Sequence, residues 1–412
     1  MKRILTIAKN KNQPSFFWNT SLPTLPQGIS FSRASIANST NELGSMIQAS
    51  TNSPRLGDFV NSVNKGLLIE PQRTNAVTKS KGNSFTWTGA GVETATANFG
   101  VAPNGATETL CVNTTATTRY GFINVAASNS EVKSLSIYVK KTAANNSIII
   151  GGWFLGGTTS VTSNYTLKTN TGVLTFANGT ASTFTIVTDC CNFWRVGIVV
   201  TNNATGNTSF RLTVQPTTTS VNFELWGYQI ETSGSPTSLI QTSGAAGTRY
   251  VDLCTITDLT KLGLTTAVMN AGFTLYVEGD GSNPQWGGTL LSISDGTDAN
   301  SIDMWPNTPA YSGLKPNSTI SVGGVAAGAD GANNTPIGST VKMALAYTGA
   351  GTWKLACSGR SDVQTITNGL PPVTTAYIGR RFAGEGLTGH VGKVATYQFV
   401  LSDAQLLNLV NS

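Results

Sequence analysis

Charged residues are scarce in this chain of 412 residues, and long apolar runs are absent. Asp, Glu, Lys and Arg make up 11% of the chain, about half the usual share. Hydrophobic residues still make up 39%, which excludes the disordered class with high net charge and few apolar residues. No apolar run approaches the roughly 18 residues of a membrane-spanning helix. The run of residues 4–8 is also too short for a signal-peptide core, so we expect no membrane insertion.

Histidine and paired carboxylates, which most hydrolases need, are nearly lacking. The one histidine is His390, so a catalytic triad or a histidine-based metal site has almost nothing to work with, and we expect a structural role for it. Cleavage of a glycan needs two carboxylates about 5–10 Å apart. Glu224 and Glu231 are expected on opposite faces of a strand, and Asp298 and Asp303 are spaced no better. We therefore predict no catalytic residues and no enzyme.

The cysteines form a poor disulfide framework, because their number is odd and two are adjacent. Free and mostly buried thiols are the better interpretation, and they fit folding in a reducing cytoplasm. The five are Cys111, Cys190, Cys191, Cys254 and Cys357.

Positive charge is concentrated near the N-terminus. Residues 1–81 contain ten Lys or Arg and three Asp or Glu, a net of +7, whereas residues 82–412 contain sixteen and seventeen, a net of −1. These cations either pair locally or form a basic segment that docks on an acidic partner. We expect no nucleic-acid partner, since no Lys/Arg cluster is interleaved with aromatic residues.

The chain is rich in short β-branched and aromatic runs separated by Gly, Asn and Asp, which is typical of an all-β protein. Residues 81–240 contain such runs, and residues 135–140 alternate with a period of two. A second series starts with the alternating residues 273–278. We predict two consecutive β-sandwich (jelly-roll) domains, over residues 81–255 and 256–412.

The two ends of the chain carry different signals. Five prolines forbid long helices and central strands within residues 1–80, which predicts an extended N-terminal arm. Near the C-terminus, Ser402 and Gln405 form a capping box before an apolar face, which predicts a short helix.

Several motifs resemble those of one group of proteins. Residues 66–75, GLLIEPQRTN, resemble a "GLLIE-x-QRTN" signature of bacteriophage virion proteins with carbohydrate-binding-module-like β-sandwiches, and residues 31–35, FSRAS, resemble their opening. The segments WGYQIE, PTSLI and GTRYVD within residues 225–252 resemble the end of that sandwich. Residues 377–409 resemble the end of a laminin-G/concanavalin-like sandwich.

The resemblance implies a non-enzymatic structural protein on a phage virion: a head fibre, tail fibre or decoration protein, assembled in the host bacterial cytoplasm. It implies other virion proteins as partners and a homo-oligomer, with a trimer favoured. Two alternatives stay open, a tail adhesin that recognises host surface polysaccharide and, less favoured, a capsule depolymerase.

Aromatic residues in Gly/Pro/Asn-rich loops are the candidates for binding host cell-surface glycans, because sugars stack on flat rings. Trp286, Trp305 and Tyr311 lie in such loops, and Trp87 and Trp153 are further candidates. The alternative for each is a place in the core.

The aromatic triplet Phe16, Phe17 and Trp18 must be covered by something. It either packs on the protein's own sandwich or docks the arm on a virion partner. At the other end of the arm, Glu70 and Arg73 are predicted to form an ion pair in a structural hinge before the first sandwich.

No cofactor is expected apart from a possible Ca²⁺. Asp280, Asp295 and Asp298 lie in Gly-containing turns that can supply oxygen ligands. Asp-Gly is also an ordinary hairpin-turn signal, so turns without a metal are the alternative.

Overall fold

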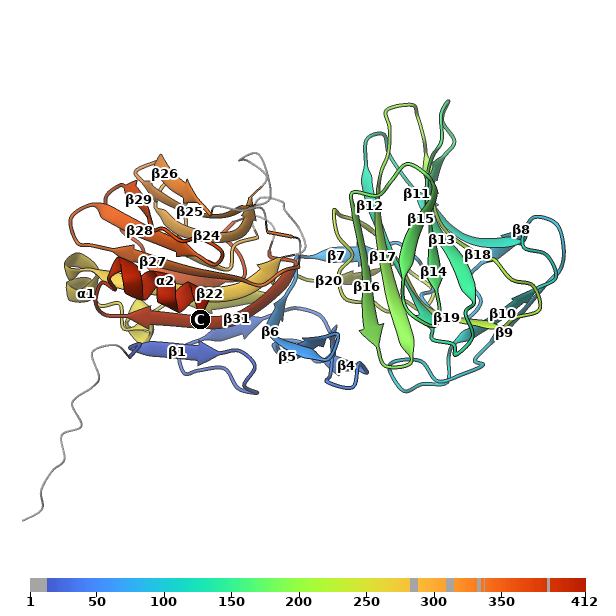
Figure 1. Cartoon of the computed structure of the whole chain (residues 1–412), viewed down its shortest axis with the longest axis horizontal. Coiled ribbons are helices and arrows are strands. Elements are labelled where there is room, and N and C mark those ends of the chain that lie inside the picture. Colours follow the sequence, from blue (N-terminus) through green and yellow to red (C-terminus); the bar gives the residue numbers. More distant parts are fainter. Residues whose placement is uncertain (1–12, 282–287, 309–314, 332–334, 337, 384–385) are drawn as a thin grey trace, which may run out of the picture. The chain divides into compact units, whose positions relative to one another are not determined.

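The computed structural model describes residues 13–281, 288–308, 315–331, 335–336, 338–383 and 386–412. It divides the chain into two compact units. Unit 1 combines Met1–Phe31 with Leu253–Ser412, and unit 2 is Ser32–Asp252. Both units are built from antiparallel strands (Figure 1), so the prediction of an all-β chain with two sandwiches is confirmed.

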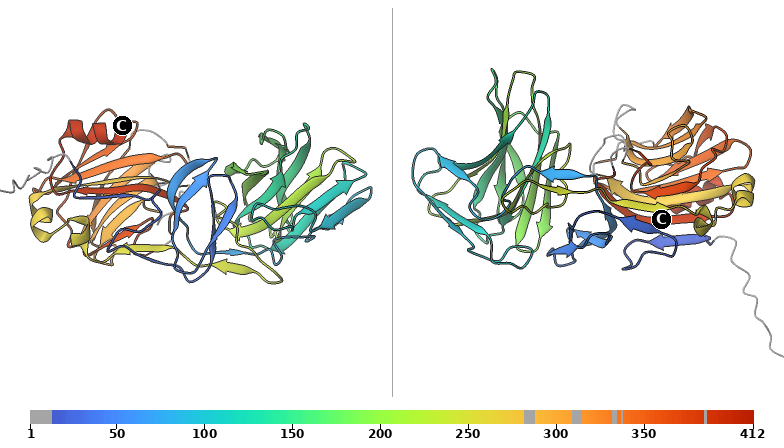
Figure 2. Two further views of the ribbon diagram at one scale, coloured as in Figure 1. Left: turned by 90° about the horizontal axis from the view of Figure 1, so that it is seen from below. Right: turned by 180° about the vertical axis from the view of Figure 1, so that it is seen from behind.

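Unit 2 is a sandwich of two sheets (Figure 2). The first sheet has the strand order β16-β17-β12-β19-β10-β9, and the second has the order β15-β14-β13-β18-β11-β8. The strands are β8 (Thr86–Thr88), β9 (Glu93–Ala97), β10 (Leu110–Thr114), β11 (Tyr120–Ala126), β12 (Val132–Lys140), β13 (Ser147–Leu155), β14 (Val161–Lys168), β15 (Leu174–Gly179), β16 (Phe184–Cys190), β17 (Phe193–Thr201), β18 (Ser209–Pro216) and β19 (Phe223–Thr232).

Period-two alternation produces the core between these sheets. In β12, Leu135 and Ile137 point inward, and in β13 Ile148 and Ile150 do the same. Successive side chains of a strand point to opposite faces, so the residues between them face outward from the sandwich.

The outer face of the first sheet is covered by a further layer of unit 2. Trp226 and Tyr138 of this sheet pack with Leu239 and Met46 from the covering segments. The covering strands are β3 (Ala37–Thr40), β4 (Met46–Ala49), β5 (Arg55–Val60), β6 (Val63–Ile69), β7 (Arg73–Asn75) and β20 (Gly247–Arg249).

Unit 1 is a second sandwich. One of its sheets runs β29-β28-β27-β22-β31 with β1 beside β31, and the other runs β2-β21-β30-β23-β24-β25-β26. The strands are β1 (Phe16–Asn19), β2 (Ser30–Ser32), β21 (Leu253–Ile256), β22 (Phe273–Gly281), β23 (Leu291–Ser294), β24 (Ser301–Thr308), β25 (Lys315–Val322), β26 (Val325–Asp330), β27 (Val341–Tyr347), β28 (Thr352–Cys357), β29 (Gln364–Thr367), β30 (Thr375–Ile378) and β31 (Gly389–Tyr397).

The described residues of unit 1 include three short helices: η1 (Leu259–Leu262), α1 (Thr266–Ala271) and α2 (Asp403–Asn411). The capping box at α2 is present, because the Ser402 side chain accepts from the Gln405 backbone and Gln405 accepts in return. Within the described ranges, no helix is both long and apolar enough to cross a bilayer.

The predicted arm of residues 1–80 is not one extended segment. Its described part contains strands β1 to β7 and is shared between the two units, which divide at Phe31 and Ser32. The prolines fall between strands instead of preventing them: Pro54 directly precedes β5, and Pro71 separates β6 from β7. The change back to unit 1 occurs at Asp252 and Leu253, three residues before the predicted boundary at 255.

Candidate functional site

The outer face of the second sheet of unit 2 carries a group of aromatic and polar side chains. Since Ile148, Ile150 and Phe154 of β13 point into the core, the alternate residues Gly151 and Trp153 point outward. The first sheet has its outer face covered, so the second sheet presents the more open face of this sandwich. Trp153 is half-buried there.

Trp153 is held in place by polar and ring contacts. Its Nε1 donates to Asn164 Oδ1 at 2.6 Å, and Asn164 Nδ2 donates to Asn178 Oδ1 at 2.7 Å. The Tyr120 ring lies 5.2 Å from the Trp153 ring, with 51° between their planes. These contacts fix the indole before any ligand arrives.

A glycine makes room for this arrangement. Gly151 pairs with Asn164 on β14 and with Thr213 on β18. A Cβ atom at Gly151 would lie 2.0 Å from Asn164 Oδ1 and 2.8 Å from Thr213 Oγ1. Only glycine therefore allows the Asn164 amide to reach the indole.

Strand β11 extends the group. Tyr120 and Phe122 alternate with the inward Gly121 and Ile123, and their rings are 6.3 Å apart. The Arg211 guanidinium, from β18, lies 4.2 Å from the centre of the Phe122 ring, within the range of a cation–π interaction. We call Tyr120, Phe122, Trp153, Asn164 and Arg211 the aromatic face.

Chemically, the aromatic face suits a polar ligand with apolar patches. Half-buried rings offer flat surfaces, while a guanidinium and fixed amides offer hydrogen bonds. A sugar ring has this combination of C–H patches and hydroxyl groups.

The motifs GLLIE, FSRAS and GTRYVD meet elsewhere, in a buried ion network inside unit 2. Glu70 Oε2 pairs with Arg55 and, at 2.8 Å, with Arg249. Ser238 also donates to Glu70, from its backbone N at 2.5 Å and its Oγ at 2.6 Å. Asp252 pairs with Arg55 and, at 2.9 Å, with Arg33.

Electrostatics agree with a structural role for this network. Burial opposes ionisation of Glu70, but Arg249, Arg55 and the Ser238 hydrogen bonds more than offset it and hold the pKa of Glu70 far below its usual range. Burial raises the pKa of the neighbouring Glu231, which accepts two hydrogen bonds from Thr237. Both carboxylates are buried, so neither is open to a ligand.

The prediction that Glu70 pairs with Arg73 is wrong, because Glu70 has other partners. Glu70 contacts Arg55 and Arg249, whereas Arg73 donates to the carbonyl oxygen of Gln72. Glu70 directly follows β6 and its side chain points into the network, whereas Arg73 begins the next strand, β7. Partners distant in sequence replace the local one.

Of the predicted glycan-binding residues in the loops of unit 1, the structure describes Trp305 alone. Trp286 and Tyr311 lie outside the described residues. Trp305 is 3% exposed, and the Arg381 guanidinium covers it at 5.4 Å. Arg381 is held there by Asp298 at 2.7 Å and Asp303 at 3.1 Å, so Trp305 offers no open ring for a sugar.

The candidate calcium ligands have protein partners. Asp280 Oδ1 lies 2.9 Å from His390 Nδ1, and Asp295 accepts from Thr297 and Asn300. In the part of the chain that the structure describes, no three His, Cys, Asp or Glu side chains gather as a metal site. Calcium binding stays a prediction.

The N-terminal aromatic triplet is split by its strand. Trp18 lies in β1, which pairs with β31, and is 2% exposed. The preceding residue of the same strand, Phe17, is 56% exposed. Trp18 therefore packs on its own unit, and Phe17 is the member that remains available to a partner. Phe16 is half-buried.

The cysteines are free thiols, and all but Cys191 are buried. Burial raises the pKa of Cys190 and of Cys357 to about 12, so these thiols are unreactive near neutral pH.

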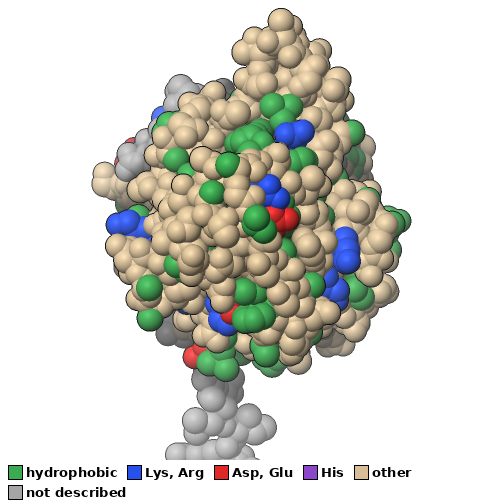
Figure 3. Space-filling view, turned by 90° about the vertical axis from the view of Figure 1, so that its right-hand side faces the viewer, with side chains coloured by type: hydrophobic (Ala, Val, Ile, Leu, Met, Phe, Trp, Pro, Cys, Tyr) green, Lys and Arg blue, Asp and Glu red, His purple; other side chains and the backbone are tan. Residues whose placement is uncertain are grey.

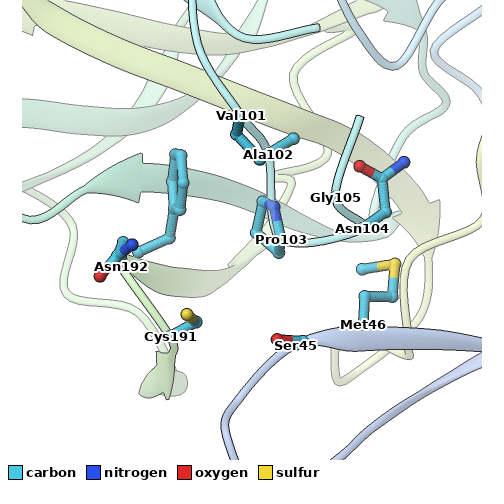
Figure 4. Close-up of a pocket in the computed structure, with 10 residues that line it drawn as sticks. Ser45, Met46, Val101, Ala102, Pro103, Asn104, Gly105, Cys191 and Asn192 are labelled. Carbon is cyan, nitrogen blue, oxygen red and sulfur yellow. The ribbon is translucent and has the colours of Figure 1, made fainter. Parts of the chain in front are cut away.

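A pocket of about 260 Å³ lies in unit 2 beside Cys191 (Figure 4). Its volume is below the roughly 300–1,000 Å³ of most small-molecule sites. Asn104, one of its polar side chains, already donates to Glu108 at 2.7 Å. The pocket lining is Ser45, Met46, Val101, Ala102, Pro103, Asn104, Gly105, Cys191, Asn192 and Phe193.

One face of the molecule is mostly uncharged. In Figure 3, polar uncharged side chains and backbone dominate, and hydrophobic or charged side chains occur singly or in small groups.

Comparison with known proteins gives structural likenesses of low identity. No protein-family model matches the chain, and no curated protein matches it. Among solved structures, the CBM40 of the Ruminococcus gnavus IT-sialidase is 16% identical, with 36% of this chain and 86% of that chain covered and a TM-score of 0.30. Domain 4 of AbnA, a GH43 extracellular arabinanase from Geobacillus stearothermophilus, is 12% identical, with 39% of this chain and 73% of that chain covered and a TM-score of 0.31. The CBM22-1 xylan-binding domain of Paenibacillus barcinonensis Xyn10C is 11% identical, with 41% of this chain and 94% of that chain covered and a TM-score of 0.25.

Of the aromatic face, only Trp153 was among the sequence candidates. A signal for the others is present in the sequence. Tyr120 and Phe122 alternate on one face of a strand, and Arg211 lies between the apolar Phe210 and Leu212 of another. Their meeting depends on the pairing of β11 with β18 and of β18 with β13, which no local pattern reveals.

Proposed function

We propose that this chain is a non-enzymatic structural protein of a phage virion surface, in which unit 2 displays a glycan-binding face. The aromatic face carries the proposal: Trp153 and Tyr120 lie 5.2 Å apart beside the fixed amide of Asn164 and the guanidinium of Arg211. Rings held in advance by hydrogen bonds lose little conformational freedom when a sugar binds.

The phage context is supported by the motifs of residues 31–35 and 66–75. Because such proteins form oligomers, each copy adds one aromatic face to the assembly. Weak sites that are linked in this way bind much more tightly than one site alone. A tail adhesin is the neighbouring possibility, and the same face would serve it.

Affinity electrophoresis of the full chain through gels that contain arabinan, xylan, polygalacturonate or bacterial lipopolysaccharide tests the proposal. We expect at least one polysaccharide to retard the wild type, and Trp153→Ala to remove the retardation. Trp194→Ala is the matched control. Trp194 is also half-buried, its Nε1 donates to Thr169 O at 2.9 Å, and Lys141 lies 4.3 Å from its ring.

Retardation of Trp153→Ala equal to that of the wild type would show that the aromatic face is not the glycan site. Release of reducing sugar during the same incubation would contradict the non-enzymatic assignment and favour a depolymerase.

A further inference from the structure

The second sheet of unit 2 contains no acidic residue. None of its six strands, β8, β11, β13, β14, β15 and β18, includes an Asp or Glu, while Arg211 and Lys168 provide two cations. The first sheet of the same sandwich contains both signs, with Glu224 beside Lys140 as one example. The positive charge of the second sheet is therefore not neutralised within the sheet.

Arg211 is also singular among the arginines of unit 2. The Arg211 side chain makes no hydrogen bond or ion pair to another residue of this fully described unit. Its one contact of note is the Phe122 ring. The other arginines of the unit each donate to a carboxylate or carbonyl oxygen: Arg33, Arg55, Arg73, Arg119, Arg195 and Arg249.

We propose that Arg211 binds the carboxylate of an acidic sugar whose ring lies against Trp153 and Tyr120. This inference rests on the proposed glycan-binding function of the aromatic face and specifies its ligand class. The guanidinium is planar and presents its donors in a fork that matches a carboxylate. Stacking on Phe122 fixes the plane of that fork before the ligand binds.

The surroundings of Arg211 indicate why its ligand should carry a carboxylate. No carboxylate or carbonyl oxygen of the protein accepts from the Arg211 guanidinium, so its donors stay available to a ligand. Because the strands of the second sheet contain no Asp or Glu, an incoming carboxylate meets no like charge from this sheet. Because the pair forms on a partly exposed face, its contribution falls as salt rises.

Isothermal titration calorimetry with two matched ligand pairs tests this inference. One pair is trigalacturonate and its trimethyl ester, and the other is 3′-sialyllactose and lactose. We expect one acidic ligand to bind about ten- to hundredfold more tightly than its neutral partner, as a hydrogen-bonded charge pair implies. The two pairs distinguish a hexuronic acid from a sialic acid.

Variants assign the effect to Arg211. Arg211→Gln should bind the acidic and the neutral ligand of the preferred pair equally, and Arg211→Lys should retain part of the preference, because it keeps charge without the planar fork. Arg119→Gln is the control. Arg119 adjoins β11 but already pairs with Glu93, so its loss should leave the preference unchanged.

Failure of this inference is separable from failure of the proposed function. Equal binding of acidic and neutral ligands by the wild type, or an acidic preference that persists in Arg211→Gln, overturns the role of Arg211 while the glycan-binding face stands. Absence of binding to all four ligands also overturns it, and polysaccharide retardation that Trp153→Ala abolishes would then still support the function.

Discussion

A carboxylate that leaves water on folding needs cations and N–H or O–H donors in its place. Glu70 obtains them from Arg55, Arg249 and Ser238. These partners come from segments far apart in sequence, so the network ties the covering layer of unit 2 together. At the residue scale, the most distinctive motif of the sequence is therefore a structural device and not a binding site.

Replacing Glu70 by Gln leaves two buried guanidinium groups without their shared carboxylate. We expect the free energy of unfolding to fall by about 3–5 kcal/mol, the usual cost of breaking a buried ion pair. Urea denaturation followed by circular dichroism measures it. Glu93→Gln, which breaks the partly exposed pair with Arg119, should cost at most about 1 kcal/mol.

The same variant has a pH signature. The pKa of Glu70 is lowered on folding from an ordinary value of 4.5, so its contribution is complete above that value and is lost as pH falls below it. The stability difference between wild type and Glu70→Gln should be constant near neutral pH and shrink below about pH 4.5. A difference that grows with acidity would contradict the assigned role.

At the element scale, β13 separates stability from function by its alternation. Gly151 faces Asn164 on the outer side, whereas a Cβ at Gly152 would lie 2.7 Å from a Val200 methyl and 2.8 Å from the Phe210 ring. We expect Gly152→Ala to lower the free energy of unfolding by about 1–3 kcal/mol through overpacking.

Gly151→Ala should instead displace Asn164 and Trp153 and weaken polysaccharide retardation, with a smaller loss of stability than Gly152→Ala. Affinity electrophoresis and urea denaturation of the two variants provide the comparison. Equal polysaccharide binding by Gly151→Ala and wild type would show that the Asn164–Trp153 contact does not build the site.

In strand β1, too, neighbouring residues separate a role in stability from a role in binding. Trp18→Ala removes a fully packed side chain and should cost about 3–5 kcal/mol. Phe17→Ala removes an exposed ring and should change stability by no more than about 0.5 kcal/mol. If Phe17 docks on a virion partner, Phe17→Ala should reduce incorporation into particles, as measured by immunoblotting of purified virions, and normal incorporation would refute that docking role.

The elements themselves were largely predictable, because their signals are local. The period-two runs of β12 and β22 and the capping box of α2 are visible in the sequence and present in the structure. The strands of residues 13–80 were not predicted, since prolines at turns look the same as prolines in an extended arm.

The sites were predictable only where one residue sufficed. Trp153 stands out in an apolar strand, but its neighbours Tyr120 and Arg211 come from strands more than thirty residues away in sequence. For Glu70, a nearby Arg73 was the natural expectation, and the actual partner Arg249 arrives from the other end of unit 2. Non-local pairing decides both outcomes.

At the scale of the whole molecule, we propose that one face of unit 2 recognises glycans through Trp153, while buried tryptophans elsewhere in the described residues serve packing. Core tryptophans such as Trp226 and Trp353 are buried, with hydrogen bonds from their indole groups to Glu108 and to the carbonyl oxygen of Asn368. Each indole N–H thus reports on a separate environment.

The most direct test is the indole ¹⁵N–¹H spectrum of the full chain, recorded while a retarding polysaccharide fragment is added, with the Trp153 signal assigned through Trp153→Phe. We expect a concentration-dependent shift of the Trp153 signal and none of the Trp226 and Trp353 signals. A ligand that binds while the Trp153 signal stays unmoved would contradict this expectation.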